Sequence, residues 1–142
     1  MAATLFASLS SSDGNWIVEL EDIAPDGGNK RVSIGWLKAS HRETDAAKSK
    51  PYKPFHPHTR AVPVQPGRVE SYAIEMRETS YVFRAGHRIQ LLVKAQDAPW
   101  EGASYVYRLS LHLPRNEEVR HTVYHTPEYP SSLLLPLIPA KR

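Results

Sequence analysis

The chain has 142 residues, of which 41% are hydrophobic and 23% charged, a balance typical of a globular domain. The formal net charge is only +3 and the basic residues are dispersed, so we expect no nucleic-acid partner. The absence of cysteine excludes disulfides, cysteine-ligated metal sites and a thiol nucleophile. We expect no membrane span and no signal peptide, a cytoplasmic location, and one domain covering residues 1–142.

Apolar and polar residues alternate along most of the chain, and this period of two predicts β-strands. In chain order the predicted strands lie near residues 5–9, 16–20, 32–36, 72–76, 89–95, 105–113, 119–125 and 133–138. Turn-forming residues separate them: Asp13-Gly14-Asn15, which predicts a β-hairpin, then 25–28, 66–67 and 85–86. Many short strands with regular turns predict an all-β antiparallel sandwich of jelly-roll type.

Residues 41–66 break this pattern, because they contain five prolines and almost no apolar alternation. We predict an extended crossover between the two layers, with one or two helical turns within residues 43–50. Prolines restrict the chain before it folds, so such a segment is suited to lie ordered along a surface. Tyr52 and Phe55 are expected to pin it by apolar contact.

Catalytic motifs are not found in the sequence. Gly102-Ala103-Ser104 begins the G-x-S-x-G pattern of a nucleophilic serine, but Val106 stands where the second glycine is needed. The phosphate-binding glycine loops and the H-E-x-x-H zinc motif do not occur either. We therefore expect no catalytic residue and no cofactor in this chain.

Two histidine pairs have spacings that suggest metal ligation. His56 and His58 would place two imidazoles about 7 Å apart on one side of an extended chain. A shared metal would require a third ligand that the sequence does not show, so the favoured interpretation is loop anchoring by hydrogen bonds. His121 and His125 would lie about 13 Å apart on a strand, too far to share one ion. We expect no metal site.

The aromatic residues provide a second set of candidates, since aromatic rings stack on sugars. Trp16 and Trp36 lie at alternating apolar positions and are interpreted as core residues, whereas Trp100 lies in a predicted loop. His41-Arg42 and His87-Arg88 are interpreted as polar structural residues. The candidate interface or loop-anchoring residues are His41, Arg42, Tyr52, Phe55, His56, His58 and Trp100.

An ordered set of short motifs resembles the C-terminal domain of X-Pro dipeptidyl-peptidases and of the related cocaine-esterase-type (CocE/NonD) hydrolases. The resemblance covers about residues 16–139. The motifs are Gly35-Trp36-Leu37-Lys38-Ala39-Ser40-His41-Arg42, Phe55-His56-Pro57-His58, Pro66-Gly67, Ser80-Tyr81-Val82-Phe83-Arg84-Ala85-Gly86-His87-Arg88-Ile89, Asp97-Ala98-Pro99, His121-Thr122-Val123-Tyr124-His125 and Pro130-Ser131-Ser132-Leu133-Leu134-Leu135-Pro136.

The resemblance implies a jelly-roll sandwich similar to galactose-binding modules, which follows an α/β-hydrolase domain carrying the catalytic Ser, Asp and His. None of these three maps onto this chain. The resemblance therefore implies a non-catalytic C-terminal part of a larger serine hydrolase, which braces the catalytic domain and contributes to the rim of its substrate pocket. The catalytic domain would be the partner, on the same polypeptide or another subunit, and an oligomer is compatible with this.

The alternative is a stand-alone carbohydrate- or ligand-binding β-sandwich module. A bracing domain is expected to present a broad apolar or mixed surface of at least about 800 Å². A sugar-binding module is expected to present a small concave site with one or two exposed aromatic residues. The substrate and the oligomeric state do not follow from the sequence.

Overall fold

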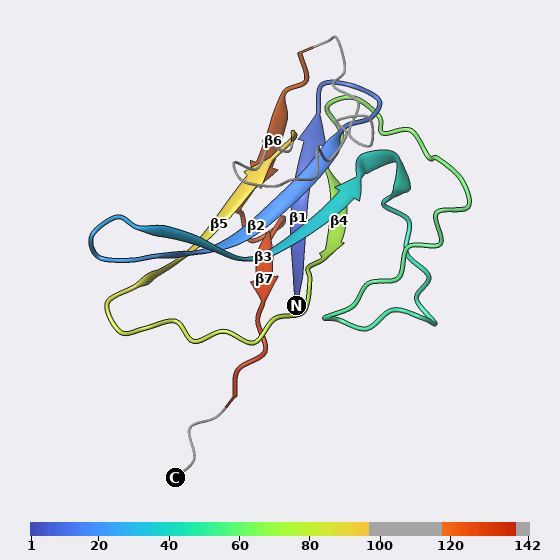
Figure 1. Ribbon diagram of the computed structural model, residues 1–142. Coiled ribbons are helices and arrows are strands. Elements are labelled where there is room, and N and C mark those ends of the chain that lie inside the picture. Colours follow the sequence, from blue (N-terminus) through green and yellow to red (C-terminus); the bar gives the residue numbers. More distant parts are fainter. Residues whose placement is uncertain (97–117, 139–142) are drawn as a thin grey trace, which may run out of the picture.

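The computed structural model of the chain describes residues 1–96 and 118–138. Within these residues, seven strands form two antiparallel sheets, which confirms the predicted all-β sandwich (Figure 1). The described helical structure is one 3₁₀ turn, η1 (Ala39–His41), and no described helix could cross a lipid bilayer. The strands are β1 (Ala2–Leu9), β2 (Asn15–Ile23), β3 (Asn29–Lys38), β4 (Glu70–Glu75), β5 (Arg88–Lys94), β6 (His121–Tyr124) and β7 (Ser132–Leu134).

The first sheet has the order β4-β1-β6, and β7 also pairs with β1. The second sheet has the order β3-β2-β5. Neighbours within each sheet are antiparallel, and β1 and β2 are the central strands. Because β4 pairs only with β1 in the described first sheet, its other edge is free to accept hydrogen bonds from elsewhere.

The core lies between the sheets and is built from the alternating residues of β1, β2 and β4, as predicted. Trp16 and Tyr72 are its largest fully buried side chains, and their ring centroids lie 5.0 Å apart. Burial raises the pKa of Tyr72 to about 12, so its hydroxyl stays neutral at physiological pH. The buried core cluster is Ala3, Leu5, Ala7, Leu9, Trp16, Val18, Leu20, Leu37, Ala39, Val64, Tyr72, Ile74 and Met76.

The predicted inward face of β3 is wrong at Trp36, which is 36% exposed. Trp36 pairs with Ile17 on the outer face of the second sheet, whereas Gly35 and Leu37 pair with the inward-facing residues of β2. A register shift after Leu20 moves the alternation by one residue, as a β-bulge does. Trp36 is therefore a surface aromatic, not a core residue.

The predicted hairpin at Asp13-Gly14-Asn15 is also wrong, since β1 and β2 belong to different sheets. The Asp13 carboxylate accepts hydrogen bonds from the backbone N–H groups of Gly14 and Ser40, both at 2.9 Å. These bonds attach the turn to η1, so the chain crosses the sandwich instead of reversing within one sheet. The turn at 25–28 does join two paired strands, with Gly27 at φ +88°.

Several predictions fall on or near parts of the chain that the structure does not describe. The predicted strand 105–113 and the loop residue Trp100 lie outside the described residues. The predicted last strand is shorter than expected, since β7 ends at Leu134. Beyond Pro136, Leu137 and Ile138 are 86% and 92% exposed, so they do not extend the core. Whether the sandwich is of the galactose-binding type stays a prediction.

Candidate functional site

Residues 41–66 leave the second sheet after β3 and enter the first sheet at β4, on the side of the sandwich where β4 lies (Figure 1). They make the crossover that the prolines predict. Two short backbone bonds hold its later part: Val62 N–H donates to Ser40 O, and Val64 N–H donates to Ser12 O, each at 2.7 Å. Val64 is 2% exposed and enters the core, so the segment is pinned by an aliphatic residue that the sequence did not single out.

The tip of the crossover, residues 43–60, is closed by polar contacts. The guanidinium of Arg60 donates to both carboxylate oxygens of Glu43, at 3.0 and 2.8 Å, and these bonds lower the pKa of Glu43. Asp45 N–H donates to Phe55 O at 2.9 Å. Ser49 N–H donates to Asp45 O at 2.9 Å, which closes one isolated turn, without a helix, where one or two helical turns are predicted.

Three imidazoles meet at the crossover. Both ring nitrogens of His56 face backbone carbonyls, Nδ1 at 3.0 Å from Glu43 O and Nε2 at 2.8 Å from Ala73 O. The ring of His58, whose φ is +51°, lies 5.7 Å from that of His56 and 5.2 Å from that of His41. Burial and, to a lesser degree, the neighbouring imidazoles lower the pKa of His58.

His56 is poorly suited to ligate a metal, since both its ring nitrogens already face carbonyl oxygens. Within residues 1–96 and 118–138, no three His, Cys, Asp or Glu side chains are placed to hold a metal ion together. His121 lies on β6, as the strand prediction required, and its ring packs edge-on against Trp16 at 4.8 Å. His56 makes hydrogen bonds of the kind that loop anchoring requires, and its role as an anchor stays a prediction.

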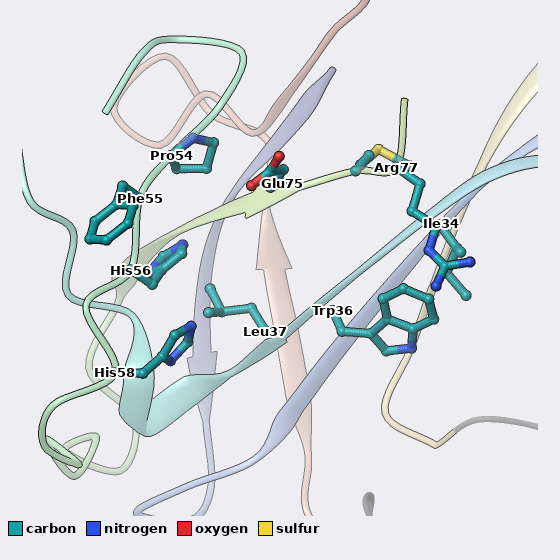
Figure 2. Close-up of a pocket in the computed structure, with 10 residues that line it drawn as sticks. Ile34, Trp36, Leu37, Pro54, Phe55, His56, His58, Glu75 and Arg77 are labelled. Atoms are coloured by element: carbon teal, nitrogen blue, oxygen red, sulfur yellow. The ribbon is translucent and has the colours of Figure 1, made fainter. Parts of the chain in front are cut away.

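A groove of about 350 Å³ lies between the crossover and the end of the second sheet. Figure 2 shows Pro54, Phe55, His56 and His58 on one side of it and Trp36 on the other. Phe55 is 41% and Trp36 36% exposed, so both rings are accessible to a partner. The lining residues are Ile34, Trp36, Leu37, Pro54, Phe55, His56, His58, Glu75, Met76 and Arg77.

The groove brings together only some of the predicted residues. Phe55, His56 and His58 line it, and His41 touches it through the ring of His58. Tyr52 lies apart from it, half exposed, and its carbonyl accepts from the amino terminus at 3.4 Å.

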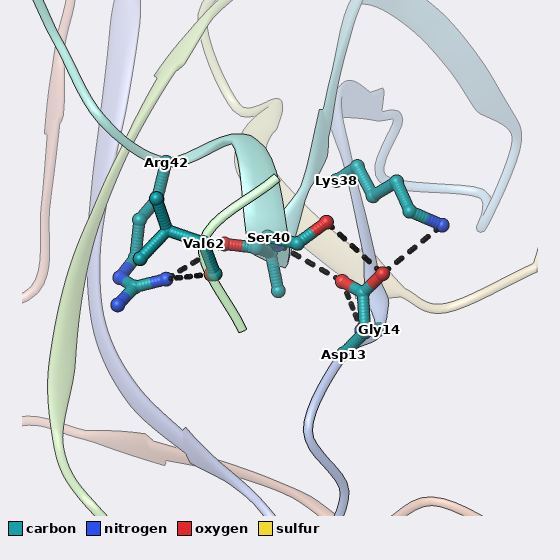
Figure 3. Close-up of polar contacts among 7 residues, drawn as sticks. Asp13, Gly14, Lys38, Ser40, Arg42 and Val62 are labelled. Atoms are coloured by element: carbon teal, nitrogen blue, oxygen red, sulfur yellow. Dashed lines mark hydrogen bonds and ion pairs between the residues drawn. The ribbon is translucent and has the colours of Figure 1, made fainter. Parts of the chain in front are cut away.

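The side chain of Arg42 makes its contacts within the domain. Its guanidinium donates to Val62 O at 2.7 Å (Figure 3). It also lies 3.5 Å from the carboxylate of Glu70, and only 14% of the Arg42 side chain is exposed. These contacts tie the start of the crossover to its end and to β4. Arg42 is therefore an internal brace, and little of it is available to a partner.

The same region contains a second polar cluster around Asp13 (Figure 3). Besides the two backbone bonds, its carboxylate accepts from the Ser40 hydroxyl at 3.0 Å and pairs with Lys38 at 3.1 Å. Burial alone would raise the pKa of Asp13, but the hydrogen bonds from Ser40, Gly14 and Lys38 lower it below 3.8 overall. The cluster fixes η1, and with it the point at which the crossover begins.

Trp36 and Arg77 are among the groove residues that sequence reasoning missed. The guanidinium carbon of Arg77 lies 5.3 Å from the centroid of the Trp36 ring, a cation–π contact. The glycine before Trp36 was the one available signal, since a glycine within a strand often marks a close approach of another backbone. At Gly35, a side chain would overlap the carbonyl oxygen of Glu75. A glycine required to face the opposite sheet puts its neighbour Trp36 on the outside.

The fold and the groove define a β-sandwich domain whose accessible features are a braced crossover and exposed aromatic residues. Residues 1–134 match the family described as the X-Pro dipeptidyl-peptidase C-terminal non-catalytic domain, and the chain belongs to this family. The predicted resemblance is confirmed, and the chain is a non-catalytic C-terminal domain of the kind found in CocE/NonD-type hydrolases.

Individual relatives agree with this assignment. A proposed serine esterase of Mycobacterium bovis is 34% identical over 103 residues, which are 69% of this chain and 16% of that protein. Cocaine esterase of a Rhodococcus species is 27% identical over 141 residues, which are 97% of this chain and 22% of that protein. The chain therefore spans about a fifth of the length of these relatives.

A solved structure supports the fold. A CocE/NonD family hydrolase from Staphylococcus aureus superposes with a TM-score of 0.75 at 21% identity, over 92% of this chain and 26% of that one. An aminopeptidase from a marine-sediment thaumarchaeon gives a TM-score of 0.66 at 27% identity, over 92% of this chain and 21% of that one.

Proposed function

We propose that this domain braces the α/β-hydrolase catalytic domain of a serine hydrolase and forms part of the rim of its substrate pocket. The observation that carries the proposal is the groove between Trp36 and Phe55, two exposed aromatic side chains held on a braced surface. Aromatic residues are enriched in the centres of protein interfaces, where they bury a large area with few rotatable bonds.

The crossover suits such a role because its shape is already set. The bonds of Val62 and Val64 hold one end, and Arg60 and Asp45 close the tip. A preorganised surface loses less conformational entropy on docking than a free loop does. Phe55 can therefore be presented at low entropic cost.

Catalysis is assigned to the partner. The relatives are named as esterases, and the sequence contains no nucleophile elbow of its own. The reaction class is then ester or amide hydrolysis by a serine of the catalytic domain. That domain would be on the same polypeptide or on a second subunit, and this chain would act by fixing its position.

The test uses the full hydrolase, or the complex of this chain with its catalytic subunit. The double variant Trp36→Ala and Phe55→Ala should lower the thermal midpoint of the catalytic domain and raise KM for a p-nitrophenyl ester. Val82→Ala is the matched control, since Val82 is an exposed apolar residue, 79% accessible, outside the groove. An effect of the double variant no larger than that of the control would contradict the proposal.

One observation favours a second candidate function, a ligand-binding module. The groove is small and contains two exposed aromatic residues, the arrangement expected of a sugar site. Titration of the isolated chain with a panel of oligosaccharides, monitored by tryptophan fluorescence, distinguishes the ligand-binding module from the bracing domain. Saturable quenching that Trp36→Ala abolishes, with no change in the hydrolase, would favour the ligand-binding module.

A further inference from the structure

The imidazole of His56 lies between two hydrogen-bond acceptors. Its Nδ1 is 3.0 Å from Glu43 O and its Nε2 is 2.8 Å from Ala73 O. A backbone carbonyl can only accept, so each contact requires an N–H on the ring. A neutral imidazole has one N–H, and its bare nitrogen would direct a lone pair at the second carbonyl. Only the doubly protonated ring satisfies both contacts.

These two bonds connect the tip of the crossover to the sandwich. Glu43 belongs to the crossover, whereas Ala73 belongs to β4, whose outer edge is unpaired in the described sheet. Among the described residues, the other polar links from the tip are longer or more exposed. The Lys53 ammonium lies 3.8 Å from the exposed carboxylate of Glu75, and the amino terminus lies 3.4 Å from a carbonyl of the tip.

The charged groups around His56 do not compensate its charge directly. The carboxylate of Glu43 is engaged by Arg60, and that of Glu75 is approached by Lys53. The titratable and charged groups that surround the ring are Glu43, His58 and Arg60 of the crossover, Lys53 beside it, His41 and Arg42 at η1, and Glu70 and Glu75 of β4.

Among these groups, His58 responds most directly to the state of His56. Burial and the charge of the other two imidazoles lower the pKa of His58. The neutral form of His58 is therefore favoured more than it would be for an exposed imidazole. Since His58 also lines the groove, the protonation state of the pair affects the groove wall.

We propose that His56 is a proton-operated clamp: its imidazolium bonds both carbonyls and fastens the tip of the crossover to β4. Loss of one proton leaves the ring only one of the two bonds, so the clamp loosens. The closed clamp binds one more proton than the released form. The closed population therefore falls as the pH rises. Release moves Pro54 and Phe55, so the wall of the groove changes with pH. The inference stands on the bonds of His56 and does not depend on what the groove binds.

The first test is limited trypsin digestion of the 142-residue chain at about pH 6 and about pH 8. Cleavage after Lys48, in the tip, is normalised to a free peptide of the same sequence at each pH. The normalised rate should rise about tenfold or more at the higher pH, the loss expected for a charge-assisted hydrogen bond. In His56→Gln, cleavage should be rapid and independent of pH, whereas His58→Gln should keep the pH dependence. A wild-type rate that does not change with pH, or an equal pH dependence in His56→Gln, would overturn the clamp.

The second test does not need a variant. Ring ¹⁵N NMR of the histidines should show both nitrogens of His56 protonated at about pH 6. A bare ring nitrogen on His56 at that pH would also overturn the proposal.

Discussion

The sandwich and the crossover hold their shapes by opposite means. In the core, Trp16 and Tyr72 are almost completely buried, and apolar contact between the sheets provides the stability. Between residues 43 and 66, by contrast, only Pro54 and Val64 are buried, and the segment is held by hydrogen bonds and restricted dihedrals. A segment fixed in this way can leave aromatic side chains exposed without collapsing onto them. The comparison explains how one small domain can be stable and still offer an interaction surface.

The largest expected effect contrasts the two tryptophans on paired strands of the second sheet. Trp16→Ala should lower the free energy of unfolding by about 3–5 kcal/mol, because it removes a ring that packs against Tyr72 and His121. Trp36→Ala should cost less than about 1 kcal/mol, because that ring is exposed. Urea denaturation followed by circular dichroism measures both. Similar losses for the two variants would mean that the second sheet is oriented differently.

The same two residues show how far the sequence could predict the fold. Alternation located the seven described strands, and it gave the correct inward face where a strand is regular, as in β1, β2 and β4. It failed at Trp36 because the pairing of β2 with β3 contains a register shift. That shift depends on how the two strands pair, and the local sequence of β3 does not show it. The turn at Asp13 failed for a related reason, since its hydrogen-bond partner Ser40 lies far along the chain.

The candidate site was predictable only within the crossover. The prolines around His56 and His58 identified a stiff, surface-lying segment from local composition. Trp36 and Arg77 complete the groove through tertiary contacts between sheets, so the sequence did not place them there. His41 came next to His58 because η1 turns the chain back at that point.

Gly35 tests the junction between the sheets, where the crossover side of the sandwich closes. A Cβ at Gly35 would overlap the carbonyl oxygen of Glu75, a backbone atom that cannot rotate away. We expect Gly35→Ala to lower the free energy of unfolding by about 1–3 kcal/mol. In the control Gly28→Ala, the only tight contact of the new methyl would be with the flexible side chain of Asp26, at 3.1 Å, and stability should change little. A neutral Gly35→Ala would mean that β3 and β4 do not approach closely.

Asp13 tests the polar fastening at the start of the crossover. Its folded-state pKa lies below 3.8, so it stabilises the fold above that pH, and the contribution is lost as the pH falls through the folded value. Asp13→Asn should lower the free energy of unfolding at neutral pH by about 1–2 kcal/mol, a value that allows for partial exposure.

The pH dependence identifies the cause. Urea denaturation of the wild type and of Asp13→Asn should give a constant difference above about pH 5 and a shrinking one below about pH 4. Lys38→Met, which leaves the backbone bonds of Asp13 in place, should reproduce only a small part of the loss. A stability difference between the wild type and Asp13→Asn that grows as the pH falls would contradict the lowered pKa of Asp13.

The smallest expected effect tests whether prolines stiffen the crossover. Pro63 is exposed and lies between Val62 and Val64, whose N–H groups make the two short bonds that pin the segment. Pro63→Ala leaves both bonds intact and adds conformational freedom mainly to the unfolded chain, so stability should fall by about 0.4–1 kcal/mol. The stability of Pro63→Gly should be lower still, because glycine gains more conformational freedom on unfolding than alanine does. In differential scanning calorimetry, the thermal midpoint should therefore be highest for the wild type, lower for Pro63→Ala and lowest for Pro63→Gly. If alanine and glycine proved equal to the wild type, preorganisation by proline would be wrong, and the hydrogen bonds alone would hold the crossover.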